Sequence, residues 1–140
     1  MLKLTEKLDN TLCNWGLLIL RATTGLLLAL GHGWDKLTNF SAYAAEFADP
    51  FGVGPSLSLA LTVFAEFFCA IAVALGILAR LAVLPIIIMF LTIVLIIHGN
   101  DTWDKQEFGL LYLLPFVVIL LTGPGKYSLD NLILKWKRNE

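Results

Sequence analysis

Four apolar runs dominate the sequence, and polar stretches separate them. The runs lie at about 14–34, 56–77, 81–98 and 107–122. An α-helix needs roughly 20 mostly apolar residues to cross the hydrocarbon core of a bilayer. Transmembrane β-strands would alternate apolar and polar positions, whereas these runs are continuous Leu, Ile, Ala, Val and Phe. The pattern predicts an all-α membrane protein, a bundle of four transmembrane helices in one domain over residues 1–140.

Two shorter segments outside these runs also show helical spacing. Residues 40–51 repeat aromatic and alanine side chains once per turn, which predicts a short helix lying at the outer membrane interface. Residues 128–138 begin with Ser128, a favourable N-cap, and end in a basic cluster. This C-terminal segment is therefore predicted to be an amphipathic helix lying against the cytoplasmic headgroups. Its apolar face consists of Leu129, Leu132, Ile133 and Trp136.

Composition supports a membrane location and argues against one class of partner. Hydrophobic residues make up 58% of the chain, and charged residues make up 15% against about 25% in soluble domains. A small protein cannot bury so much apolar surface, since most of its residues touch the solvent. Lipid must therefore be the solvent for much of this chain. The formal net charge of −1 gives no indication of nucleic-acid binding.

The distribution of basic residues predicts how the helices are oriented. Loops on the cytoplasmic side of a membrane protein carry an excess of Lys and Arg. With four spans, both termini share a side with the loop around Arg80, and that side carries seven basic residues against two on the other. The N- and C-termini are therefore expected in the cytoplasm. The seven are Lys3, Lys7, Arg80, Lys126, Lys135, Lys137 and Arg138.

Two charged residues lie inside the apolar runs and need partners there. Ionisable groups within a span usually face the bundle interior. Counting about 1.5 Å per residue, Arg21 in the first span and Glu66 in the second differ in depth by roughly 5 Å, which an arginine side chain can bridge. An Arg21–Glu66 ion pair is the expectation, because either charge alone would be buried without compensation. Such a pair could be a purely structural tie, or it could also line a functional cavity.

A polar seam is expected to run from this pair toward the outer surface. On an ideal helix Arg21, Gly25, His32 and Lys36 share one face. His98 ends the third run at the same outer level. The sequence thus predicts a ligand pocket that opens outward. Its candidate residues are Arg21, His32, Lys36, Glu66 and His98.

The two histidines have alternative interpretations. His32 and His98 could instead be interface residues that bond to loop carbonyls. A metal site built from both and nearby carboxylates is chemically conceivable. However, the chain lacks the fixed ligand spacing of a motif such as HExxH, so no metal is predicted.

Several segments resemble the DoxX family of bacterial membrane proteins. The resemblance rests on "RATTGLLLALGHGWDKL", "AEFFCAIAVALGILARLAV" and "GPGKYSLDNLI", and it covers nearly the whole chain. The closing pattern G-x-G-x-[YW]-S-x-D, matched by Gly123–Asp130, is its most specific part. The resemblance implies four spans in the bacterial cytoplasmic (inner) membrane. It also implies a link to redox chemistry, since relatives include a subunit type of thiosulfate:quinone oxidoreductase and proteins that support maturation of redox enzymes. The other matched positions are Arg21, Gly33–Lys36, Glu66, Gly76 and Arg80.

Three functions follow from these expectations. The favoured one is a quinone-linked or otherwise redox-associated membrane subunit, whose pocket binds a quinone and whose Glu66 exchanges protons as the candidate catalytic residue. The second is a non-catalytic scaffold or assembly factor for a redox partner. The third and least favoured is a small transporter, because only one polar seam is present and the cytoplasmic half of the last two spans is wholly apolar.

Electron transfer would require help from outside this chain. The sequence carries no CxxCH, no iron–sulfur cysteine set and no GxGxxG, so no intrinsic cofactor is predicted and a bound quinone is the candidate ligand. If the protein is catalytic, it is expected to be an oxidoreductase subunit that depends on a redox protein partner. The lipid bilayer and a second copy of the chain are the other expected partners.

Overall fold

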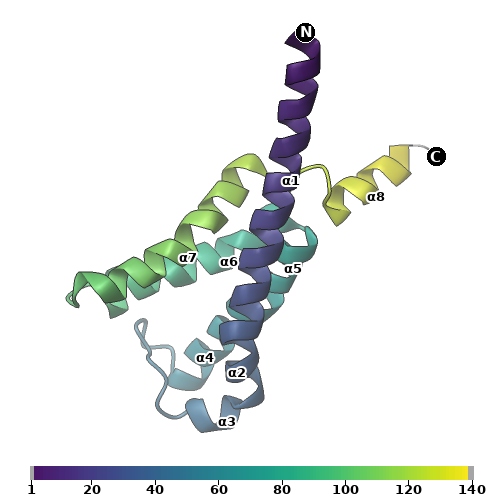
Figure 1. Cartoon of the computed structure of the whole chain (residues 1–140). Coiled ribbons are helices and arrows are strands. Elements are labelled where there is room, and N and C mark those ends of the chain that lie inside the picture. The colour runs from purple at the N-terminus through teal and green to yellow at the C-terminus, as the bar shows by residue number, and fades with distance from the viewer. Residues whose placement is uncertain (1, 139–140) are drawn as a thin grey trace.

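The computed structural model of the chain describes residues 2–138 as helices joined by short loops. The first helix, α1 (Leu2–Leu28), runs without a break through a π-helical segment, η1 (Ala29–Gly33), into α2 (Trp34–Thr38). A short helix, α3 (Phe40–Tyr43), follows. In Figure 1 the N-terminal part of α1 extends well beyond the other spans, and α3 lies at the opposite end of the molecule.

The second span is also interrupted by a π-helical segment. It consists of α4 (Pro55–Val63), η2 (Phe64–Cys69) and α5 (Ala70–Leu75). Pro55 stands at the first helical position, where its fixed φ and missing N–H suit a helix start. Gly76 ends the span with a φ of 75°, a left-handed conformation that favours glycine.

The third and fourth spans pack along one another. The third span consists of α6 (Ala79–Thr92) and a π-helical segment, η3 (Ile93–Ile97), and the fourth is α7 (Trp103–Thr122). The last helix, α8 (Leu129–Arg138), leaves the bundle beside α1 and points away from the spans (Figure 1). It is the amphipathic C-terminal helix that the sequence predicted.

Four helical stretches are long and apolar enough to cross a membrane, as predicted. They extend over Leu8–Thr38, Pro55–Leu75, Ala79–Ile97 and Trp103–Thr122. Many of their large side chains are exposed, including Leu30, Ile88 and Leu121, as expected of surfaces that lipid solvates. The orientation of the bundle across the membrane remains a prediction.

The outer interfacial helix is much shorter than predicted. Helical spacing suggested a helix over 40–51, but α3 ends at Tyr43 and the chain continues in turns. Pro50 disfavours helical conformation in Asp49, so a helix could not have continued through residue 51. Beyond it, Gly52 and Gly54 adopt φ values of 67° and 104°, and the chain stays non-helical up to Pro55.

Close approach of backbones holds the first span against the second. A Cβ added at Gly25 would lie 2.6 Å from the Ala70 carbonyl oxygen, and one added at Gly33 would lie 2.8 Å from the backbone of Glu66. Gly25 and Ala70 therefore form a close contact between the two helices. Tight van der Waals packing of this kind associates helices in lipid, where no hydrophobic driving force acts between them.

Candidate ligand-binding site

An ion pair between Lys36 and Glu66 is the polar centre of the candidate site. The Lys36 Nζ lies 2.6 Å from the Glu66 Oε2. The Glu66 side chain is only 6% exposed and that of Lys36 is 22% exposed. Glu66 lies on η2, and Lys36 lies on α2, just beyond the close backbone contact at Gly33. The packing of the first two spans therefore brings these two side chains together.

π-helical segments carry or adjoin three of the five predicted site residues. His32 lies on η1, Glu66 lies on η2 and His98 follows η3 directly. A π-helical turn closes with an i→i+5 hydrogen bond, so it rotates the side chains that follow it relative to a regular α-helix. Such turns occur frequently at functional sites. Here they change which neighbours these residues meet.

A cavity of about 560 Å³ adjoins the ion pair. Its walls are mostly apolar and come from the second span, the third span and the loop after α3. Ligand pockets in proteins typically occupy roughly 300–1,000 Å³, with apolar walls and a few polar groups. The polar lining residues are Lys36, Ser58, Thr62, Glu66, Thr92 and His98.

The cavity reaches the surface of the bundle between the second and third spans. Leu61, Phe64 and Ile88 line it and are each at least 50% exposed. These helical surfaces face the hydrocarbon of the membrane if the helices span it, as their length and composition indicate. An amphiphilic molecule could therefore enter the cavity from the bilayer.

Asp49 organises the loop that covers part of the cavity. Its carboxylate accepts the Ser58 hydroxyl at 2.8 Å and the backbone N–H groups of Val53 at 3.0 Å and Gly54 at 2.7 Å. These hydrogen bonds, the one from Ser58 foremost, hold the pKa of Asp49 below its usual value. They fix the loop carrying Phe47 and Phe51, which line the cavity. The sequence interpretation missed Asp49, although an aspartate before Pro-Phe-Gly is typical of such turns.

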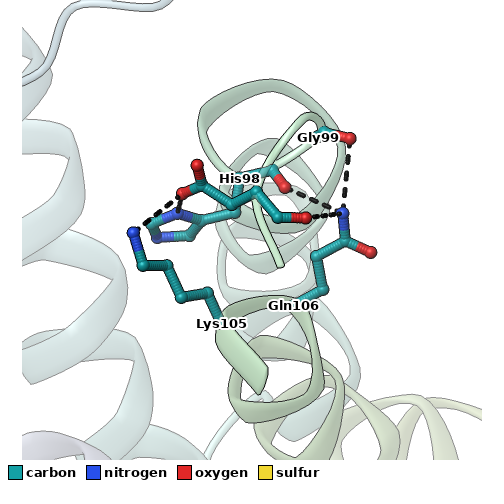
Figure 2. A network of polar contacts seen from close by, with 5 residues as sticks. His98, Gly99, Lys105 and Gln106 are labelled. Carbon is teal, nitrogen blue, oxygen red and sulfur yellow. Dashed lines mark hydrogen bonds and ion pairs between the residues drawn. The ribbon is translucent and has the colours of Figure 1, made fainter. Parts of the chain in front are cut away.

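His98 lies at the rim of the cavity within a polar network at the start of α7. The His98 Nδ1 lies 2.7 Å from the Asp101 carboxylate, and the Lys105 Nζ lies 3.3 Å from the same carboxylate. Figure 2 shows the His98 ring and the side chains of Lys105 and Gln106 in this network. The His98 hydrogen bond, followed by that of Lys105, lowers the pKa of Asp101. Gln106 donates to the His98 carbonyl at 2.8 Å. This network fixes the position of the imidazole at the rim.

The predicted Arg21–Glu66 pair is wrong. Arg21 is 2% exposed, and its guanidinium donates to the carbonyls of Val73 at 3.4 Å, Ala74 at 2.5 Å and Tyr127 at 2.6 Å. Val73 and Ala74 lie in the last turn of α5, where carbonyls lack the i→i+4 partners of a helix interior. The Val73 carbonyl also accepts the Gly76 N–H at 3.0 Å. Those carbonyls face Arg21 directly, whereas Glu66 lies about 12 Å further along the span, at 1.5 Å per residue.

Arg21 belongs instead to a structural latch formed by residues 125–130. The Asp130 carboxylate accepts the backbone N–H of Leu78 at 2.9 Å and of Ala79 at 3.3 Å, which caps α6. The Asp130 N–H in turn donates to the Gly76 carbonyl at 3.0 Å. A Cβ at Gly76 would lie 2.9 Å from the Arg21 Nη1. The closing sequence motif thus joins the ends of three spans.

Ser128 and His32 have partners outside the cavity. The Ser128 Oγ accepts the Asn131 N–H at 3.2 Å, so the predicted N-cap of α8 is confirmed. His32 lies against the rings of Tyr112 and Phe108 on α7, with centroids 5.5 and 6.0 Å away. The structure therefore brings Lys36, Glu66 and His98 to one cavity and places Arg21 and His32 elsewhere.

The polar groups of the cavity are suited to hydrogen bonding. Within residues 2–138, no three His, Cys, Asp or Glu side chains are grouped as metal ligands. Lys36 uses one N–H on Glu66, and an ammonium group has three. Among the described residues, only Lys36 bonds to the Glu66 carboxylate, so its Oε1 retains the capacity to accept a hydrogen bond. The site thus offers a donor and an acceptor side by side.

Comparisons with known proteins relate the sequence to membrane proteins. The family described as DoxX matches residues 16–99, which is more than half of the chain. The inner membrane protein YqjF of Escherichia coli (strain K12) is 27% identical over 124 residues, covering 86% of this chain and 93% of that protein. No solved structure matches the chain significantly.

Proposed function

The chain belongs to the DoxX family and is a multi-pass inner membrane protein, and on that premise we propose that its cavity binds a quinone headgroup. In this proposal the protein is a redox-associated membrane subunit. The single observation that carries it is the Lys36–Glu66 pair at a largely apolar cavity that lipid-soluble molecules can enter. A quinone combines a long apolar tail with a small polar ring, and this site offers a place for each.

Each polar residue has a distinct role in the proposal. Lys36 donates a hydrogen bond to a quinone carbonyl oxygen with an N–H that Glu66 does not use. Glu66 Oε1 accepts the O–H of the reduced ring, a hydroquinone, and exchanges a proton with it. His98 at the rim is half-buried and bonded to the exposed Asp101, so it provides a route for protons between the cavity and water.

A partner must supply or take the electrons. The chain has no sequence motif for a haem, an iron–sulfur cluster or a dinucleotide. The proposal therefore assigns quinone binding and proton exchange to this chain and electron transfer to a redox protein that docks on it. With the termini in the cytoplasm, as the basic residues favour, the cavity lies in the outer half of the membrane.

The proposal is tested on protein purified from native membranes in mild detergent. Solvent extraction and mass spectrometry should find quinone in near-stoichiometric amounts with the wild type and much less with Glu66→Gln or His98→Ala. Glu107→Gln serves as the matched control, because Glu107 is exposed on α7 and does not line the cavity. A quinone-free wild type that also fails to bind added quinone in a titration would contradict the proposal.

A second candidate function is a scaffold or assembly factor for a redox partner. The observation in its favour is an exposed apolar tip on the loop between the first two spans, formed by Tyr43, Phe51 and Val53. Exposed apolar patches of this kind often mark protein contacts. Co-purification of a partner that survives Glu66→Gln but is lost on Val53→Ser, at an exposed position that does not line the cavity, would favour the scaffold. Loss of the partner in neither variant would exclude this tip as its docking surface.

A further inference from the structure

We propose that α8 binds anionic phospholipid headgroups and that the latch of residues 125–130 converts this binding into stability of the bundle. The inference concerns the end of the molecule around Arg21 and is independent of any ligand in the cavity. It rests on three observations: an unpartnered apolar face, a flanking basic cluster and a rigid connection to three spans.

The apolar face of α8 has no partner among the described residues. Leu132, Ile133 and Trp136 are all exposed, and Trp136 is 68% exposed. On a helix these residues and Leu129 fall within an arc of roughly 100°. Leu134, 65% exposed, lies outside this arc, and the other remaining side chains of α8 are polar. An amphipathic helix of this kind lies in the membrane interface, with its apolar face directed into the acyl region.

The charges around this face fit anionic lipid. Lys135 and Lys137 flank the apolar arc at roughly 90–110° on either side, where their long side chains can reach the headgroup layer. Arg138 and Lys126 add two more exposed cations at the same end. The single acid of α8, Asp130, accepts hydrogen bonds from the N-terminus of α6. Its negative charge therefore already interacts with backbone N–H groups inside the protein.

The level at which α8 leaves the bundle is also that of the membrane interface. Tyr127, two residues before α8, contacts the ring of Trp15 on α1, with centroids 5.0 Å apart. Trp15 is exposed near the start of the apolar part of α1. Trp and Tyr are enriched where the bilayer meets water. The occupant we assign to α8 is accordingly the headgroup layer of the same membrane that the four helices cross.

The latch connects α8 rigidly to the spans. Asp130, in the first turn of α8, caps α6 through Leu78 and Ala79, and the Tyr127 carbonyl accepts from the buried Arg21. The Lys126 N–H donates to Asn14 on α1 at 2.8 Å. These bonds exist only in the folded bundle, so they set the position of α8 at the lipid surface only in the native state. Lipid that favours the docked helix therefore stabilises the native bundle by mass action.

The test compares the full-length protein in nanodiscs of phosphatidylcholine with nanodiscs containing phosphatidylglycerol. The melting temperature of the wild type should rise by roughly 4 °C with the anionic lipid, given the strength of basic residues near a charged surface. The triple variant Lys135→Gln, Lys137→Gln, Arg138→Gln should lose most of this rise. The charge-conserving control Lys135→Arg, Lys137→Arg, Arg138→Lys should keep it.

A second measurement separates lipid contact from its coupling to the fold. Brominated acyl chains quench nearby tryptophan, and the difference between wild type and Trp136→Phe isolates the signal of Trp136. We expect stronger quenching by brominated phosphatidylglycerol than by brominated phosphatidylcholine. Asp130→Asn should retain this preference but show a smaller rise in melting temperature, since it weakens the latch and leaves the cations in place.

Each of the following outcomes would refute one part of the proposal. Equal quenching by both brominated lipids, or an unchanged rise in the triple glutamine variant, would refute binding of anionic headgroups by these residues. Preferential quenching without any rise in melting temperature would refute the coupling through the latch. A Trp136 that no brominated lipid quenches would refute contact between the apolar face of α8 and the acyl chains.

Discussion

Arg21 and Glu66 are both charged and buried in a bundle of apolar helices, yet their surroundings differ in kind. Arg21 is enclosed by backbone carbonyls at the end where the latch joins three spans. Glu66 pairs with Lys36 and adjoins a cavity that reaches the lipid-facing surface. The comparison shows that an intramembrane charge can be a fixed part of the structure or a group available to a ligand, according to what its hydrogen-bonding capacity meets.

The largest expected effect comes from removing the Arg21 side chain. Arg21→Leu leaves the buried Ala74 carbonyl and the partly buried Tyr127 carbonyl without this donor, so we expect a loss of roughly 3–5 kcal/mol in the free energy of unfolding, or failure to accumulate in the membrane. Denaturant unfolding in detergent, followed by circular dichroism, measures the effect. Arg80→Gln, at an exposed position of the same end, should change stability little. Equal stability of wild type and Arg21→Leu would refute the structural role of Arg21.

Glu66→Gln should affect ligand binding more than folding. It leaves Lys36, which is partly exposed, without a charged partner, at a cost to unfolding of about 1–2 kcal/mol. Quinone affinity should fall about tenfold, because the change weakens the placement of Lys36. The preference for hydroquinone over quinone should fall as well, since an amide serves both forms. Anaerobic titration of each form monitors this change, and a variant that binds both forms as the wild type does would argue against the role of Glu66.

Replacing the whole ion pair should sharpen the comparison with Arg21. Lys36→Met together with Glu66→Met removes both charges, and replacement of a buried pair by apolar residues is often neutral for stability. We expect a change in unfolding free energy of less than about 1 kcal/mol, with loss of quinone binding. Thermal unfolding and a quinone titration on the same preparation test both parts. A double variant that still binds quinone would remove the pair from the site.

The smallest expected effect concerns Asp49 and pH. Its folded-state pKa is lowered, so its contribution to holding the loop is present above the ordinary pKa of 3.8 and is lost as pH falls through the lower folded value. Titration of Asp49 should therefore cause no change in quinone affinity between pH 5 and 8. Asp49→Asn should weaken affinity roughly two- to threefold, by partial loss of the hydrogen bonds to the loop. Hydrogen exchange of the loop and a quinone titration measure the effect. If Asp49→Asn changes neither the exchange of the loop nor the affinity, Asp49 is dispensable.

Hydropathy was sufficient to predict the four spans, whereas the partners of the buried charges were not predictable from it. Depth along a helix suggested Glu66 for Arg21, but sequence patterns do not show that the Val73 and Ala74 carbonyls at the end of α5 point at the guanidinium. The π-helical segment at Ala29–Gly33 explains a second error. It turns the helix away from ideal spacing, so His32 and Lys36 meet different neighbours although a regular helix places them on one face.

Other features were recognisable in the sequence, but the residues that they contact were not. The motif Gly123–Asp130 was recognisable, yet its purpose depends on Gly76, Leu78 and Ala79, about 50 positions away. Ser128 was predictable as an N-cap because capping is local. Local hydrogen bonds follow from local sequence, and contacts between spans require the packed structure.

Photolabelling with an azidoquinone tests most directly the claim that the Glu66 region, and not the Arg21 region, binds a ligand. Protein in nanodiscs is irradiated with the probe, digested and mapped by mass spectrometry. The account predicts labelling within residues 58–66 and 88–98, which line the cavity, and suppression of that labelling by excess unlabelled quinone. Labelling concentrated near Arg21 and residues 125–130, or spread evenly over the lipid-facing helices without competition, would contradict it.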